Sequence, residues 1–183
     1  MNRSRQDWNV VVSVSGDCYK RARKLLRSFG AVEHTDYYNV LTLAVTDVPG
    51  FLETLRQAVE QEPELRDCIA RAIPATHHFL FQSAEEFETQ AKAVAAQFAP
   101  QLTGKSFYVR MHRRGFRNRL ASPREERLLD EFLLDALEHA GAPGSIRFTD
   151  PDAVIAVETV GPWAGLSLWK REDLRRYPFV RVD

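Results

Sequence analysis

Hydrophobic positions in the first seventy residues alternate between strand and helix patterns. The β-branched run WNVVVSVS at 8–15 predicts a strand that ends at Gly16 and Asp17. Apolar residues at helical spacing predict a helix over 19–29 and a second helix that starts at Pro49. Three further strands are predicted at 32–36, 40–46 and 68–73. The resulting order, β-α-β-β-α-β, is typical of a ferredoxin-like unit.

The second part of the chain begins near Pro74 and mixes helices and strands again. An amphipathic helix is expected over 83–98. Residues 106–112 alternate strictly, which predicts a strand with Phe107, Val109 and Met111 on its buried face. A short strand is predicted at 145–148, and two further strands are predicted at 153–160 and 163–168. We therefore expect an α+β protein with two domains, residues 1–73 and 74–183.

The helix after residue 121 has a strong predicted start. Ser122 is the expected N-cap, Pro123 the first helical residue, and Glu125 the partner that completes a capping box. An apolar stripe that begins at Leu129 forms the expected buried face, and the Gly-Ala-Pro-Gly sequence at 141–144 ends the helix.

Composition excludes several classes of protein. The 183 residues are 44% hydrophobic and 27% charged, which excludes a collagen-like, coiled-coil or disordered chain. Cys18 and Cys68 lie far apart and no C-x-x-C pair occurs, so we expect free thiols, a reducing compartment and no structural metal. The chain has neither a signal-peptide pattern nor an apolar run of about 18 residues, so we expect a cytoplasmic protein without a membrane segment.

Charge is neutral in sum but uneven along the chain. Lys and Arg number 25 and so do Asp and Glu, which gives a formal net charge of zero. Counted in blocks, residues 1–46 carry +3, 47–104 carry −5, 105–127 carry +6 and 128–183 carry −4. Because binding depends on where charge lies rather than on its sum, a neutral chain can still bind nucleic acid.

The +6 block is rich in arginine and contains aromatic residues. Guanidinium groups suit phosphate oxygens and stack on bases, and aromatic rings can stack on unpaired bases. The candidate RNA-binding residues are Lys105, Arg110, Arg113, Arg114, Phe116, Arg117, Arg119 and Arg124. The alternative is a solvated basic loop that only keeps the protein soluble.

Enzyme motifs are mostly absent. No phosphate-binding glycine loop, nucleophile elbow or H-E-x-x-H motif occurs, so no cofactor and no catalytic metal are expected. Cys18 follows a strand and precedes a helix, where a thiol pKa can be lowered, but the spacing of a phosphatase loop fails at Lys24. His77 and His78 are adjacent on an expected strand and point to opposite faces, which makes a poor chelating pair.

Three segments together resemble a known family. They are the strand FYVRMHRRG at 107–115, the helix opened by Ser122, and Asp150-Pro-Asp152 before the strand AVIAVE at 153–158. In this order they resemble the THUMP RNA-binding domain, which is commonly preceded by a ferredoxin-like unit. The tail at 163–177 resembles that of stand-alone THUMP proteins, which act as adaptors for tRNA cytidine acetylation. Asp150 replaces the asparagine usual in that turn.

The resemblance implies a function. It predicts an adaptor that is not itself an enzyme, that binds tRNA around the acceptor end, and that presents it to a separate RNA-modifying enzyme. One alternative is a small enzyme with a site between the two halves that uses Cys18 or His77. A further alternative, compatible with the first, is that acidic residues 47–104 dock a basic partner protein.

Overall fold

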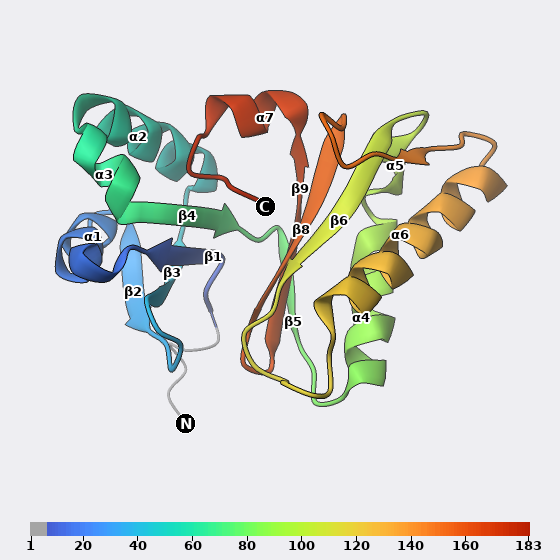
Figure 1. The fold of residues 1–183 in the computed structure, drawn as a ribbon, viewed down its shortest axis with the longest axis horizontal. Helices are drawn as coiled ribbons and strands as arrows, with labels where there is room; N and C mark the ends of the chain where they lie inside the picture. Colours follow the sequence, from blue (N-terminus) through green and yellow to red (C-terminus); the bar gives the residue numbers. More distant parts are fainter. Residues whose placement is uncertain (1–6) are drawn as a thin grey trace. The chain divides into compact units, whose positions relative to one another are not determined.

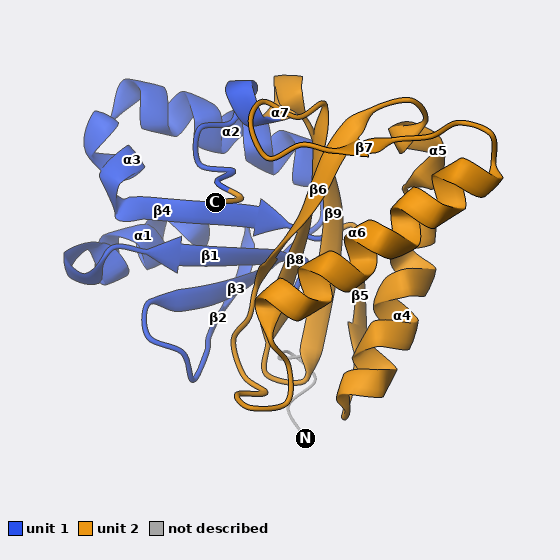
Figure 2. Cartoon of the chain, turned by 45° about the vertical axis from the view of Figure 1, so that its right-hand side comes forward, with its two compact units in different colours: residues 1–75, 174–181 blue, residues 76–173, 182–183 orange. Residues whose placement is uncertain are grey.

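The structure is a computed structural model that describes residues 7–183. The chain separates into two compact units, one containing residues up to 75 together with 174–181, the other containing 76–173 and 182–183 (Figure 2). Each unit combines one sheet with helices, which confirms the expected α+β class. The division into domains after residue 73 stays a prediction.

The first unit holds a four-stranded antiparallel sheet in the order β2-β3-β1-β4 (Figure 1). Its elements are β1 (Val10–Val14), the 3-10 turn η2 (Gly16–Cys18), α1 (Tyr19–Leu26), β2 (Gly30–His34), β3 (Val40–Val45), α2 (Val48–Gln61), α3 (Pro63–Cys68) and β4 (Ile69–Pro74). The order of strands and long helices is the predicted one, and the short helix α3 is an addition that the apolar pattern did not indicate.

Buried aliphatic residues from the sheet and helix α2 form the core of this unit. Val12 and Leu41 are opposite each other in the β1–β3 pair and are fully buried. Phe51 of α2 is buried as well, with its ring edge-on to that of Phe29, 5.0 Å between centroids. Asp47 caps α2, because its side chain accepts a hydrogen bond from the backbone N–H of Gly50 at 3.0 Å.

Residues near the C-terminus also belong to the first unit, although the sequence suggested that they belong with the second. After helix α7 (Arg171–Arg176), the chain runs beside β4, and the N–H of Ala72 donates to the carbonyl of Phe179 at 2.9 Å. Phe179 and Val180 are buried. Arg176 and Tyr177 meet at the carboxylate of Glu53 on α2, at 2.7 and 2.6 Å.

The second unit holds a five-stranded sheet in the order β5-β9-β8-β6-β7, with α4 and α6 on one face (Figure 1). Its elements are β5 (His77–Leu80), α4 (Ala84–Ala96), α5 (Ala99–Leu102), β6 (Ser106–His112), α6 (Ser122–His139), β7 (Ser145–Ile146), β8 (Ala153–Val160) and β9 (Trp163–Lys170). Strands β6 and β8 are parallel, and helix α6 makes the crossover that parallel strands require.

The core of the second unit lies between this sheet and the two long helices. Phe107, Val109 and Met111 all enter it, as the alternation predicted. Tyr108, on the opposite face of β6, is also buried. Every residue of β8 except Val160 is buried, which is typical of a strand covered on both faces.

Helix α6 does not begin as predicted. Its N-cap is Ala121, whose carbonyl accepts from the N–H groups of Arg124 and Glu125, and no side chain caps it. Glu125 is fully buried rather than turned back to the helix end, and neither of its carboxylate oxygens has a hydrogen-bond partner among the described residues. The capping pattern predicted for Ser122 does occur at α4, two helices earlier, where the Ser83 side chain accepts from the N–H of Glu86 at 3.1 Å.

The two cysteines form a disulfide, so the prediction of free thiols is wrong. Cys18 ends η2 and Cys68 ends α3, and their Cα atoms lie 5.1 Å apart although 50 residues separate them in sequence. The order of the elements places both beside the end of β1, where the N–H of Ser15 donates to the carbonyl of Cys68. The inference of a reducing compartment from free thiols therefore loses its basis.

No helix in residues 7–183 is long and apolar enough to cross a lipid bilayer.

Candidate nucleic-acid interface

The +6 block folds into two separate places rather than one patch. Lys105 precedes β6, and a basic loop, residues 113–121, follows it. Since a strand rises about 3.3 Å per residue, the eight residue steps across β6 from Lys105 to Arg113 put Lys105 about 26 Å from the start of the basic loop. Near Lys105 lies the carboxylate of Asp152, which accepts hydrogen bonds from the N–H and the hydroxyl of Ser106 at 2.9 Å. Lys105 therefore does not belong to the same surface as the loop arginines.

Arg114 anchors the basic loop. Its guanidinium forms an ion pair with Glu158 of β8 at 2.6 Å, and the Glu158 side chain is only 1% exposed. Nδ1 of His112 lies 3.5 Å from the other oxygen of the same carboxylate. The backbone of Arg114 is also held, since its N–H donates to the hydroxyl of Thr159 at 2.8 Å. With a side chain 13% exposed, Arg114 holds the loop against the sheet and offers little surface to a ligand.

Arg110 is likewise engaged within the protein. Its Nε donates to the carboxylate of Asp183 at 2.8 Å, and its Nη1 lies 3.5 Å from Glu126 of α6. The guanidinium also lies over the ring of Tyr108, 5.2 Å from its centroid. Burial and the hydrogen bond to Asp183 raise the pKa of the Tyr108 hydroxyl to about 12. Arg110 is therefore part of a folded network, with one third of its side chain exposed.

The basic loop is a tight turn with an aromatic anchor. Gly115, Phe116 and Asn118 all have positive φ angles, of 100°, 50° and 70°. The carbonyl of Phe116 accepts from the N–H groups of Arg119 and Leu120, both at 3.0 Å. The Phe116 ring packs on that of Phe81, 4.5 Å between centroids, and so ties the loop to the core. Backbone conformations of this kind cost free energy and cluster at functional sites.

Three loop arginines remain at the surface. Arg117 and Arg119 are exposed, and Arg113 is half-buried with its guanidinium bonded to the carbonyl of Gly115. The Arg119 guanidinium lies 5.8 Å from the centroid of the Phe116 ring. Arg124, on the first turn of α6 after the loop, is exposed and lies 3.1 Å from Glu88 of α4. The structure thus brings Arg113, Arg117 and Arg119 together on one short loop.

Sequence reasoning missed two kinds of residue in this unit. Glu158 lies near the end of β8, and only its pairing with Arg114 shows that it fixes the basic loop. Phe148, by contrast, is 64% exposed although it is large and apolar. The expected strand at 145–148 ends at Ile146, so Phe148 lies on the loop that follows β7. Its exposure was visible only in the folded chain.

The alternative hypothesis of a small enzyme relied on Cys18 or His77, and Cys18 is not available for catalysis. The sulfur of Cys18 is bonded to Cys68 and offers no thiol as a nucleophile. His77 lies on β5 with its ring 6.0 Å from that of Phe98, a contact typical of a packed side chain. In the part of the chain that the structure describes, no group of three His, Cys, Asp or Glu side chains could hold a metal ion.

Comparisons with known proteins give structural likenesses only. No protein-family model matches the chain, and neither does any curated protein sequence. The solved structure of PH1313 from Pyrococcus horikoshii matches with a TM-score of 0.59 at 13% identity, over 88% of this chain and 54% of that one. TrmN from Thermus thermophilus matches with a TM-score of 0.53 at 18% identity, over 87% and 44%. A possible methylase from Clostridium difficile matches with a TM-score of 0.57 at 12% identity, over 88% and 40%.

The comparisons contradict the expectation that the protein is not an enzyme. A protein described as a possible methylase has this fold along most of the present chain. The lack of catalytic sequence motifs is therefore no argument against enzymatic relatives. At identities of 12–18% these likenesses show the fold, and the chain spans about half or less of the length of the structures it matches. What they show of this chain is a THUMP-like α+β fold, as the sequence motifs implied.

Proposed function

We propose that this chain binds RNA, and tRNA in particular, as the substrate-recognition part of an RNA-modification system. The observation that carries the proposal is the basic loop. It presents Arg117 and Arg119 to solvent with the half-buried Arg113 beside them, while the buried Glu158–Arg114 pair fixes its base. The THUMP-like fold and the sequence resemblance support the same reading.

The physical argument concerns phosphate binding. Guanidinium groups on a rigid loop lose less conformational freedom when they bind than the same groups on a mobile one. Each phosphate that they neutralise releases counterions, so affinity falls linearly with salt on a logarithmic scale. The acceptor end of tRNA, where a duplex meets a single strand, offers both phosphates for the loop and unpaired bases.

The test measures tRNA binding by the full chain at several salt concentrations. Arg117→Ala and Arg119→Ala should each weaken binding and reduce the slope of log K against log salt by about one unit. Lys105→Ala is the matched control, because it removes a cation of the same sequence block at the far end of β6. Equal affinity for tRNA in the wild type and a triple Arg113, Arg117 and Arg119 to Ala variant would overturn the proposal.

The adaptor role extends this proposal to a second protein, a separate RNA-modifying enzyme. In that version the bound tRNA is presented to a separate modification enzyme, one that forms N4-acetylcytidine according to the family resemblance. Mass spectrometry of tRNA nucleosides from a deletion strain tests it directly. Loss of N4-acetylcytidine supports the acetylation system, whereas loss of another modification assigns the chain to a different enzyme. Capture of partners with and without RNase then separates protein-mediated from RNA-mediated association.

A further inference from the structure

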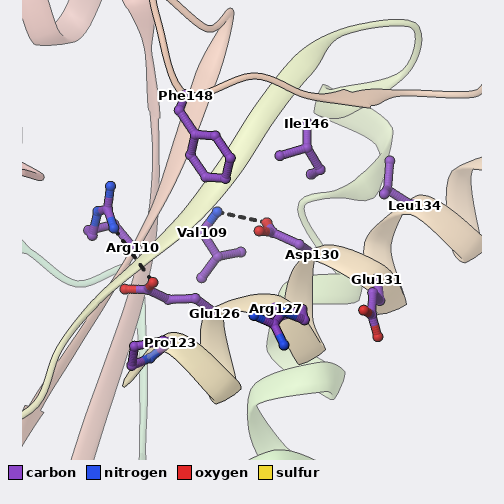
Figure 3. Close-up of a pocket in the computed structure, with 10 residues that line it drawn as sticks. All are labelled: Val109, Arg110, Pro123, Glu126, Arg127, Asp130, Glu131, Leu134, Ile146 and Phe148. Carbon is purple, nitrogen blue, oxygen red and sulfur yellow. Dashed lines mark hydrogen bonds and ion pairs between the residues drawn. The ribbon is translucent and has the colours of Figure 1, made fainter. Parts of the chain in front are cut away.

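A groove lies along the open edge of β6, apart from the basic loop (Figure 3). It has a volume of about 430 Å³, within the roughly 300–1,000 Å³ of small-molecule sites. Helix α6 forms one wall, and the loop after β7, with Phe148, forms the other. We call it the edge groove; Val109, Arg127, Asp130, Glu131, Ile146 and Phe148 are its main lining residues.

The groove exists because β7 is too short to cover β6. The strand pair extends only over Ser106 and Phe107, so the N–H groups of Val109 and Met111 have no neighbouring strand. Carboxylates of α6 take the place of that strand. Asp130 accepts from Val109 and Glu126 accepts from Met111, both at 2.8 Å (Figure 3). The polar groups that α6 brings to the edge are therefore mostly hydrogen-bond acceptors.

An exposed aromatic ring covers this edge. One side of Phe148 rests near the ring of Tyr108, 5.3 Å between centroids, and the side chain is still 64% exposed. In Figure 3 the ring lies across the groove from α6, above the Val109–Asp130 hydrogen bond. An aromatic side chain backed by a second ring and open on its other side is a platform on which a planar base can stack.

Charge at the rim fits a nucleotide. Arg127 is exposed, and its side chain forms no ion pair or hydrogen bond with any other residue of the described chain, so it can meet a phosphate. Glu131, one helical turn after Arg127, is also exposed, and its carboxylate joins that of Glu126 at the groove. Carboxylates accept hydrogen bonds from the exocyclic amino groups of bases, as glutamate and aspartate do from N4 of cytosine.

These features together select among the bases. Cytosine, adenine and guanine each carry an amino group on the Watson–Crick edge, and a carboxylate can accept a hydrogen bond from that amino group. Uracil presents two carbonyl oxygens on either side of a single N–H, and those oxygens would face carboxylates. We propose that the edge groove binds an unpaired nucleobase that carries an amino group, stacked on Phe148, and that it disfavours uracil. This inference rests on the proposed RNA-binding function.

The experiment uses the full chain with four dinucleoside monophosphates, ApA, CpC, GpG and UpU. Amide chemical shifts of Val109, Ile146 and Phe148 report occupation of the groove and give the dissociation constants. We expect the three amino-bearing probes to bind at least fivefold more tightly than UpU. Shifts confined to other parts of the protein, or equal affinity for UpU, would overturn the inference.

Variants separate stacking from hydrogen bonding. Phe148→Ala should weaken CpC binding about tenfold, since base–aromatic stacking contributes on the order of 1–3 kcal/mol per base, while Phe148→Tyr should retain it. Glu131→Gln should narrow the preference for CpC over UpU at least threefold, because an amide can donate to a uracil oxygen. Both residues are exposed, so neither change should unfold the chain.

The outcomes distinguish this inference from the proposed function. If tRNA binds through the basic loop and no dinucleotide enters the groove, the groove inference fails and the RNA-binding proposal stands. If CpC enters the groove and tRNA does not bind, the groove inference stands and the proposal of tRNA binding fails. Occupation of the groove by a hexalysine peptide, with no shift from any dinucleotide, would show that its carboxylates bind a basic protein segment and would overturn the nucleobase assignment.

Discussion

Arg114 and Glu158 form an ion pair of 2.6 Å between the end of β6 and the neighbouring strand β8, and the carboxylate is almost completely buried. This pair converts one of the eight cations of the basic block into a structural residue. Because its charge is compensated inside the protein, Arg114 contributes to the position of the basic loop rather than to its electrostatic surface. Sequence alone placed it among the phosphate-binding candidates.

The first prediction separates these two roles. Arg114→Ala leaves Glu158 buried without its main partner, which should lower the free energy of unfolding by about 3 kcal/mol. Arg117 is exposed and lies on the basic loop five residues after the end of β6, so Arg117→Ala should change the free energy of unfolding by less than about 0.5 kcal/mol. Denaturant unfolding measures both. Equal stability of the two variants would show that the buried pair does not anchor the loop.

A second prediction concerns acid stability of the first unit. Hydrogen bonds from Arg176 and then Tyr177 lower the pKa of Glu53 to about 2. Its ionised form therefore stabilises the fold above the ordinary pKa of about 4.5, and this contribution is lost as the pH falls from there toward 2. Glu53→Gln should remove that part of the pH dependence, and Tyr177→Phe should raise the Glu53 pKa in an NMR titration. If the stability of Glu53→Gln fell between pH 4.5 and pH 2 as much as that of the wild type, the contact of Glu53 with Arg176 and Tyr177 would be contradicted.

A third prediction concerns Asp130, whose contribution to stability changes with pH in the opposite direction to that of Glu53. Burial is the main cause that raises the pKa of this carboxyl to about 7, although the Val109 N–H acts against it. The folded protein therefore keeps a proton that the unfolded chain has lost, and stability falls as the pH rises from about 4 to about 7. Asp130→Asn keeps an oxygen for the Val109 N–H and should be more stable than the wild type at pH 8, by on the order of 1–3 kcal/mol. Urea unfolding at pH 5 and pH 8 checks it, and a variant that is less stable at pH 8 would refute the assignment.

The disulfide gives a fourth prediction. Cys18–Cys68 closes a loop of 50 residues, which reduces the conformational freedom of the unfolded chain. Reduction with dithiothreitol should lower the free energy of unfolding by about 4 kcal/mol. The double variant Cys18→Ser with Cys68→Ser should match the reduced protein and should no longer respond to the reductant. A wild type with equal stability in oxidised and reduced form would show that the bond does not form in solution.

Local patterns in the sequence determined most of the secondary structure. Alternation of apolar residues predicted β6 at 106–112, an apolar run predicted β8 at 153–160, and apolar residues at helical spacing from Pro49 predicted α2, whose buried residues include Phe51 and Leu55. These patterns succeed because a strand or helix that buries one face repeats its apolar residues at the period of that element. They also supported the α+β class, which needs only the order of the elements.

Tertiary structure alone decided which residues meet. In the sequence Arg114 cannot be distinguished from Arg117, since both are arginines of the same basic loop. Only the pairing of β6 with β8 brings the Arg114 side chain against the buried Glu158. Cys18 and Cys68 became partners because the sheet order brings η2 and the end of α3 together. The edge groove arises because β7 ends after two residues and leaves the edge of β6 to carboxylates of α6. Each of these depends on contacts between residues far apart in the chain, which no local period encodes.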